Sequence, residues 1–307
     1  MRLLFAGSPA AAVPSLSALR EAGHEIVAVV TNPDAPKGRG RRPAPSPVAV
    51  EAGRLGLPVF QPRRAKEPWF VDAITKLAPD LAVVVAWGCL VPDDLLTVPS
   101  HGWVNLHFSL LPAWRGAAPV QRAIMAGETL TGVTTFELVR ELDAGPVYRR
   151  AEVAVADDET AGDLLGRLAA IGARVLVDTV ADVAAGAKPS PQPAVGISLA
   201  AKVSPEDARI DWRQPAVAVH DAVRGTTPDP GAWTTCRGER LNVGRTALHG
   251  EAASPLRPGQ LSVSKRGVLV GTGDGVIRLV AVQSAGKAMM DAAAWARGAR
   301  VEGESLG

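Results

Sequence analysis

Cysteine is scarce in this sequence, whose 307 residues include only Cys89 and Cys236. The two cysteines lie far apart and neither has a partner at metal-ligand spacing, which excludes a disulfide-stapled scaffold and a cysteine-based zinc site. Long apolar runs are missing as well. The longest, Leu81 to Pro92, has twelve residues and is too short to cross a bilayer. We therefore expect no membrane span.

The sequence also lacks the signals of export and of disorder. Met1 and Arg2 lead directly into an apolar stretch, without the basic, apolar and small-residue succession of an export signal, so we expect a cytoplasmic protein. Hydrophobic residues make up 47% of the chain and charged residues 21%, which is the composition of a folded protein. The length suits two ordinary domains.

A net charge of only +2 conceals an uneven distribution. Residues 36–66 carry eight basic residues against the single acid Glu51, a local charge of +7, which leaves −5 for the rest of the chain. Such an excess is compatible with a polyanionic partner such as a nucleic acid, although charge counting alone favours a solvated loop. The basic residues are Lys37, Arg39, Arg41, Arg42, Arg54, Arg63, Arg64 and Lys66.

The first half of the chain alternates apolar runs typical of strands with amphipathic stretches typical of helices. This order predicts an α/β domain with a Rossmann-like, mainly parallel sheet. The expected helices end near Ala22 and cover Trp69 to Leu77. The expected strands cover residues 3–6, 25–31, 57–61, 81–86, 103–107 and 134–139.

The second half changes character after a long amphipathic helix that the apolar spacing predicts over Thr160 to Ala185. Three prolines between Ala187 and Gly196 indicate a semi-extended linker. Short β-like runs then follow, at residues 241–243, 259–263, 268–271 and 276–282, and favour a small OB-like β-barrel or a sandwich. We predict a first domain over 1–188, a linker over 189–206 and a C-terminal β-barrel over 207–307.

A dinucleotide site is excluded at the first strand–helix turn. The sequence Ala6-Gly7-Ser8-Pro9-Ala10 lacks the second and third glycines of the fingerprint, and Pro9 removes a backbone donor that pyrophosphate would need. The chain has no phosphate loop of the Gly-Lys-Ser/Thr type either.

The densest polar group lies on the predicted strand at 103–107. Alternation places Asn105 and His107 on one face, near the end where open parallel sheets bind ligands. An amide can donate to an oxygen that gains charge, and an imidazole exchanges protons near neutral pH, which together suit acyl transfer to an amine. A packed core histidine beside a turn-forming asparagine is an equal alternative. Asp143 lies in a turn-forming stretch, and spacing alone does not link it to His107.

Three segments identify a family. Asn105-Leu106-His107-Phe108-Ser109-Leu110-Leu111-Pro112, then Trp114-Arg115-Gly116-Ala117-Ala118-Pro119, and later Leu142-Asp143-Ala144-Gly145-Pro146 closely resemble the folate-dependent formyltransferases. Within that family the chain is most similar to the members that formylate methionyl initiator tRNA. The similarity covers essentially the whole chain. Further matches are residues 5–9, 38–42, 45–48, 208–212, 283–290 and 297–300.

The resemblance implies transfer of a formyl group from 10-formyltetrahydrofolate, without a metal, to the α-amino group of methionyl initiator tRNA. Asn105, His107 and Asp143 match the catalytic trio. In these roles Asn105 and a protonated His107 would stabilise the oxyanion, while Asp143 would orient His107 and help to remove the amine proton.

The resemblance also implies the binding residues. Phe108 stands where relatives usually carry glycine, and it could narrow the pocket or pack beneath it. The resemblance implies that the barrel binds tRNA. We expect a monomer because the sequence shows no extra dimerisation element. The candidate folate contacts are Ser109, Leu110, Leu111, Pro112, Trp87, Gly88, Cys89, Leu90 and Val91. The candidate tRNA contacts are Lys37, Arg39, Arg41 and Arg42.

Three alternatives compete with this interpretation. A formyltransferase acting on a small amine, such as glycinamide ribonucleotide or an amino sugar, shares the motifs, but the usual single-domain plan of the glycinamide enzyme leaves the region after residue 205 unexplained. A non-catalytic RNA-binding protein would use a basic loop and a barrel but has no need of the trio. A nicotinamide-dependent oxidoreductase would need the missing glycines.

Overall fold

The chain forms two compact units in a computed structural model that describes all residues except 38–41 and 251–255. The first unit consists of residues 1–117, 132–153 and 165–200, and the second of residues 118–131, 154–164 and 201–307. The predicted boundaries at 188 and 206 stay predictions. In the described part of the chain, no helix has the length and apolarity needed to cross a membrane.

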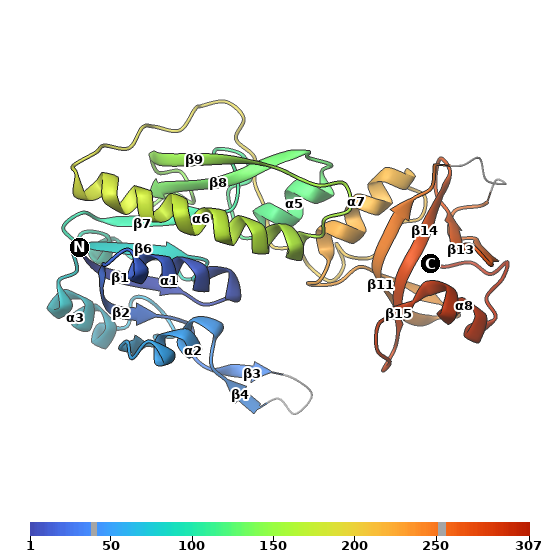
Figure 1. The fold of residues 1–307 in the computed structure, drawn as a ribbon, viewed down its shortest axis with the longest axis horizontal. Helices are drawn as coiled ribbons and strands as arrows, with labels where there is room; N and C mark the ends of the chain where they lie inside the picture. The colour runs from blue at the N-terminus through green and yellow to red at the C-terminus, as the bar shows by residue number, and fades with distance from the viewer. Residues whose placement is uncertain (38–41, 251–255) are drawn as a thin grey trace. The chain divides into compact units, whose positions relative to one another are not determined.

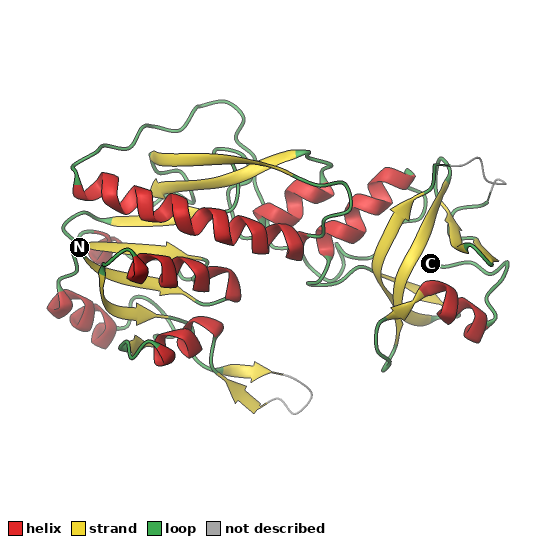
Figure 2. Cartoon of the chain, in the orientation of Figure 1, coloured by secondary structure: helices red, strands yellow, loops and turns green. Residues whose placement is uncertain are grey.

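The elements of the first unit are shown in Figures 1 and 2. Its strands are β1 (Arg2–Gly7), β2 (Glu25–Val30), β3 (Ala35–Lys37), β4 (Arg42–Ala44), β5 (Val59–Phe60), β6 (Leu81–Val85), β7 (Trp103–His107), β8 (Leu130–Glu137) and β9 (Val147–Ala154). Its helices are η1 (Ala10–Ala12), α1 (Val13–Glu21), α2 (Pro47–Arg54), α3 (Pro68–Leu77), α4 (Asp93–Leu96) and most of α6 (Ala161–Ala184).

Seven strands form one sheet in the order β5-β2-β1-β6-β7-β8-β9. The strands from β5 to β7 are parallel, and β8 runs antiparallel to β7, so the predicted mainly parallel sheet is confirmed. The chain moves outward from β1 to β2 and β5 and then returns to the other side of β1 with β6 (Figure 1). A ligand crevice is expected outside the carboxyl ends of the strands at such a reversal.

Gly7 ends β1 at this reversal, and the packing there needs a glycine. A Cβ at residue 7 would lie 2.8 Å from the Val85 carbonyl oxygen and 2.9 Å from the Ala12 Cβ. The strand can therefore approach β6 and η1 closely only without a side chain.

The two faces of the sheet are buried by different helices. Leu4 and Ala6 pack with Phe70 and Ile74 of α3 in one apolar cluster. On the other face Leu106 reaches α6, where a Cβ added to Gly172 would lie 2.8 Å from its Cδ2. The register places Asn105 and His107 on the face turned away from α6.

The second unit contains a small antiparallel barrel. Its elements are α5 (Pro119–Met125), α7 (Ala216–Thr226), β10 (Trp233–Cys236), β11 (Glu239–Leu248), β12 (Leu261–Ser264), β13 (Gly267–Gly271), β14 (Val276–Ser284), β15 (Met290–Asp291) and α8 (Ala292–Ala299). The strand order is β10-β11-β14-β13-β12, with β15 beside β14. Residues 304–307 join the two edges, because Leu306 bonds to Gly259 next to β12 and Gly307 bonds to Thr235 of β10. The predicted barrel is confirmed.

Candidate active site

Strand β7 presents two polar side chains on one face, as the alternation predicts. Asn105 lies between Val84 of β6 and Phe136 of β8 in the register of the sheet. The Asn105 side chain is partly exposed, and its amide makes no hydrogen bond to any residue that the structure describes. This amide is therefore available to a ligand at the carboxyl end of the sheet.

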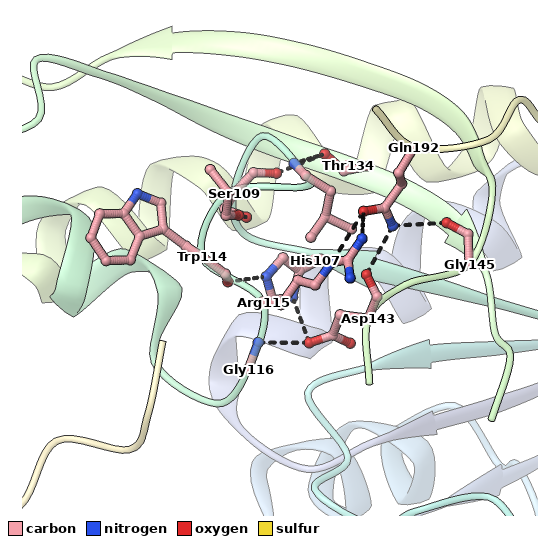
Figure 3. Close-up of polar contacts among 11 residues, drawn as sticks. His107, Ser109, Trp114, Arg115, Gly116, Thr134, Asp143, Gly145 and Gln192 are labelled. Atoms are coloured by element: carbon pink, nitrogen blue, oxygen red, sulfur yellow. Dashed lines mark hydrogen bonds and ion pairs between the residues drawn. The ribbon is translucent and has the colours of Figure 1, made fainter. Parts of the chain in front are cut away.

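His107 is buried, with 6% of its surface exposed, and it has a different group beside each ring nitrogen. Its Nε2 lies 2.8 Å from the Trp114 carbonyl oxygen (Figure 3). Because a carbonyl oxygen only accepts, Nε2 must carry the hydrogen. Its Nδ1 lies 3.9 Å from Oδ2 of Asp143, which is an ion-pair distance but too long for a hydrogen bond.

The surroundings of His107 favour a neutral ring. Burial lowers the pKa of His107 below its ordinary value of 6.5, while the Asp143 carboxylate and the Trp114 carbonyl oppose this shift. Near neutral pH the ring is therefore mostly neutral, and the hydrogen sits on Nε2. The unprotonated Nδ1 faces the Asp143 carboxylate and can accept a proton. A histidine protonated at the start, as proposed from the sequence, is disfavoured by this burial.

Asp143 comes from the loop between β8 and β9. Its Oδ2 accepts a hydrogen bond from the Gly116 amide at 2.8 Å, and its backbone is left-handed with φ of +48°. Two residues on, a Cβ at Gly145 would lie 1.7 Å from the Glu137 carbonyl oxygen, so only glycine fits there. The fold thus brings Asp143 to His107, a link that the sequence spacing did not provide.

The loop after β7 is held by its own hydrogen bonds. The buried Ser109 hydroxyl donates to the Ala113 carbonyl at 2.6 Å. Thr134 of β8 donates to the Ser109 carbonyl at 2.7 Å and accepts from the Leu111 amide at 3.1 Å. This bracing fixes the route of the chain from His107 to Trp114, whose carbonyl holds the histidine.

The candidate folate residues form two groups. Trp87, Ser109 and Leu111 are buried and shape the loops after β6 and β7 from within. Gly88 and Leu90 are exposed, and the others, Cys89, Val91, Leu110 and Pro112, are partly exposed. Both loops follow neighbouring parallel strands, so they lie at the same edge of the sheet. Phe108 is 7% exposed and packs within the protein.

Two of the candidate tRNA residues, Lys37 and Arg42, belong to a short two-stranded ribbon. Strands β3 and β4 pair antiparallel, with Lys37 opposite Arg42. The Arg42 side chain is exposed. Arg39 and Arg41 lie outside the residues that the structure describes. Elsewhere in the basic segment, Arg54 is paired with Glu51 at 2.7 Å, so it contributes less free positive charge than the sequence suggests.

Two residues that the sequence did not single out as functional hold the Asp143 loop. Gln192 accepts two hydrogen bonds from the Arg115 guanidinium through Oε1, at 2.7 and 3.2 Å. Its Nε2 donates to the carbonyl oxygens of Asp143 and Gly145, both at 2.8 Å (Figure 3). Arg115 is part of the family-like segment, but Gln192 lies in the proline-bearing stretch and carried no local signal.

Comparison with known proteins identifies the family. The family model described as "Formyl transferase" matches residues 1–180, and "Formyl transferase, C-terminal domain" matches residues 202–300. The chain belongs to the formyl transferase family. It is 53% identical to "Methionyl-tRNA formyltransferase" of Thermobifida fusca, over 100% of this chain and 99% of the relative. It is 52% identical to the protein of the same name from Acidothermus cellulolyticus, over 98% of both chains.

Solved structures share the fold. HypX from Aquifex aeolicus, crystallised as a variant, matches 99% of this chain with a TM-score of 0.69 at 19% identity. The chain spans about half the length of HypX, 48%. A phosphoribosylglycinamide formyltransferase from Anaplasma phagocytophilum matches 61% of this chain and 88% of its own, with a TM-score of 0.52 at 25% identity. The second match covers only part of the present chain.

Proposed function

We propose that this protein transfers the formyl group of 10-formyltetrahydrofolate to the α-amino group of methionine on initiator tRNA, in the cytoplasm and as a monomer. The observation that carries the proposal is the set of groups around His107, namely the Asn105 amide on the same strand face and the Asp143 carboxylate beside Nδ1. The name shared by relatives that are more than half identical over at least 98% of their lengths supports the same substrate.

The reaction begins with the amine nitrogen attacking the formyl carbon. A tetrahedral intermediate forms, and its oxygen gains a negative charge that the Asn105 amide stabilises by donating a hydrogen bond. The neutral His107 takes the surplus proton of the amine at Nδ1, and Asp143 stabilises the imidazolium that results. The bond from carbon to the folate N10 then breaks, and N10 receives the proton. The products are the formylated amine and tetrahydrofolate.

This order of proton transfers suits the electrostatics of the site. A buried ring with a lowered pKa starts neutral and is ready to act as a base. Once His107 has accepted the proton, the Asp143 carboxylate stabilises the positive charge of the imidazolium. Because Nε2 is engaged by the Trp114 carbonyl, the exchangeable position is Nδ1, on the side of the carboxylate. The proposed reaction needs no metal ion.

We assign the folate and tRNA surfaces from the exposure and the charge of their residues, respectively. The loops at residues 87–91 and 109–112 would hold the folate, with their exposed and partly exposed members in contact with it. Lys37, Arg39, Arg41 and Arg42 would contact tRNA phosphates, since guanidinium groups bind phosphate well. We propose the catalytic domain over 1–188 and a tRNA-binding role for the barrel over 207–307.

The test is a formyl-transfer assay with 10-formyltetrahydrofolate and methionylated initiator or elongator tRNA at two salt concentrations. We expect transfer to the initiator tRNA, discrimination against the elongator tRNA, and weaker binding at the higher salt concentration. Absence of transfer to initiator tRNA, or faster transfer to small free amines than to charged tRNA, would overturn the proposal.

A further inference from the structure

The proline-bearing stretch over residues 189–200, called the strap below, contacts both loops that reach His107. At its start Ser190 and Val147 exchange two backbone hydrogen bonds of 2.7 and 2.9 Å, beside the Asp143 loop. At its end Ala200 donates to the Arg115 carbonyl at 2.7 Å, beside Trp114. The strap is therefore paired at both ends with the segments that carry the neighbours of His107.

Two side chains of the strap form hydrogen bonds to those loops. Ser198 accepts a hydrogen bond from the Trp114 amide at 2.8 Å through its hydroxyl, and Gln192 holds the carbonyls of Asp143 and Gly145. Between residues 190 and 199, Gln192 and Ser198 are the two side chains that are not exposed. Their neighbour Val195, by contrast, has 80% of its surface exposed.

The two loop residues that bond to these side chains, Trp114 and Asp143, have backbone conformations that need stabilising contacts. Trp114 has φ of +61° and Asp143 has φ of +48°, both in the left-handed region that side-chain-bearing residues avoid. Such conformations persist when surrounding contacts fix them. One hydrogen bond from the Gln192 amide holds the carbonyl of Asp143 itself, and the other holds the carbonyl of Gly145, two residues later. Arg115 fixes the other end of that amide (Figure 3).

We propose that Gln192 is a positioning residue for formyl transfer, because its amide joins the loop of Arg115 to the loop of Asp143 and so holds the carboxylate beside Nδ1 of His107. This inference rests on the proposed function. Gln192 bonds to Arg115, Asp143 and Gly145, none of which is a candidate folate or tRNA contact, so we expect its removal to leave both binding surfaces unchanged. The rate of the chemical step should therefore fall while binding is kept.

The experiment compares Gln192→Ala, Gln192→Glu and the matched control Val195→Ala in the same strap. For Gln192→Ala we expect kcat to fall by about 10- to 100-fold, with KM for both substrates within about 2-fold, as for a misplaced catalytic group. Gln192→Glu keeps an acceptor for Arg115 but cannot donate to the two carbonyls, so it should lose at least as much activity. Val195→Ala should match the unaltered protein.

A double-mutant cycle with Asp143→Asn separates positioning from general damage. If Gln192 acts through Asp143, adding Gln192→Ala to Asp143→Asn should change kcat by less than about 2-fold, because the two effects are not additive. Full multiplication of the two effects would overturn the inference, and so would near-normal activity of Gln192→Glu. An inactive unaltered protein would instead count against the proposed function, so the two failures are distinguishable.

Discussion

Nδ1 of His107 lies 3.9 Å from Oδ2 of Asp143, while Nε2 of the same ring is held by the Trp114 carbonyl. The ring thus has one nitrogen fixed by the backbone and one that faces a carboxylate across a gap. This arrangement suits a base that is neutral at rest and becomes a stabilised cation during the reaction.

Replacing Asp143 by asparagine tests that arrangement. The variant keeps the side-chain shape but removes the charge that stabilises the imidazolium, so we expect kcat to fall by about 10²- to 10⁴-fold, as when the carboxylate of a catalytic triad is replaced. Single-turnover rates with saturating folate and charged tRNA give the number. A loss below about 5-fold in kcat would contradict the role of the carboxylate.

The pH dependence of kcat in the same variant should shift in a definite direction. A base must be neutral, so kcat of the unaltered protein should rise with pH through the pKa of His107, which burial places below 6.5. Asp143 raises that pKa, and removing its charge should lower the pKa further. The acidic limb of the kcat profile should therefore move to lower pH in Asp143→Asn. Movement of the limb to higher pH would be inconsistent with this assignment.

Replacing Asn105 should lower the rate of formyl transfer more than it weakens substrate binding. The amide is proposed to donate to the oxygen that gains charge, so Asn105→Ala should lower kcat by about 10²- to 10³-fold, the usual effect of losing an oxyanion donor. KM for folate should change little. The measurement is steady-state kinetics with each substrate varied in turn. A raised KM with normal kcat would instead make Asn105 a binding residue.

Two glycines of α6 should respond in opposite ways to alanine. Gly166 is exposed with open space around its Cβ position, so Gly166→Ala should stabilise the protein by about 0.5–1 kcal/mol. Gly172 is buried against Leu106, and overpacking there costs about 1–3 kcal/mol. Gly172→Ala should be destabilising on balance. Urea unfolding of both variants measures the difference, and equal shifts would refute the packing described for β7 against α6.

Replacing Arg42 should weaken tRNA binding and leave the rate of formyl transfer unchanged. Arg42→Ala should raise KM for the charged tRNA, leave kcat near normal and reduce the slope of log K against log salt by about 1. The control is Arg20→Ala, which removes an exposed arginine from α1 in the same unit. The measurement is a salt titration of tRNA binding. Equal losses in the two variants would indicate a nonspecific charge effect.

The regular elements of the fold were predictable where the local pattern and the tertiary packing agree. The observed β7 has the predicted bounds, and α6 differs by one residue at each end. The helix α7 was missed because Ala216 to Val219 alternates small and β-branched residues, a local pattern typical of a strand that tertiary packing overrides. The ribbon of β3 and β4 was missed because each of its three-residue strands carries a proline beside a basic residue, a composition typical of a loop.

The candidate site was predictable only in part. Alternation on one strand placed Asn105 and His107 on the same face, because that relation is local. The approach of Asp143 to His107 and the bridge through Gln192 depend on loops that meet only in the folded chain. Periodicity carries no information about such contacts. The resemblance supplied Asp143 through its motif but gave no reason to consider Gln192.

The most direct test is the chemical identity of the product. Methionylated initiator tRNA is incubated with the protein and 10-formyltetrahydrofolate, and the amino acid is released by mild base and analysed by mass spectrometry. We expect N-formylmethionine from the unaltered protein and a product rate lower by about 10²-fold or more from His107→Ala, the loss expected when a general base is removed. Unmodified methionine from the unaltered protein would contradict the proposed function, and formylmethionine at an undiminished rate from His107→Ala would contradict the proposed role of His107.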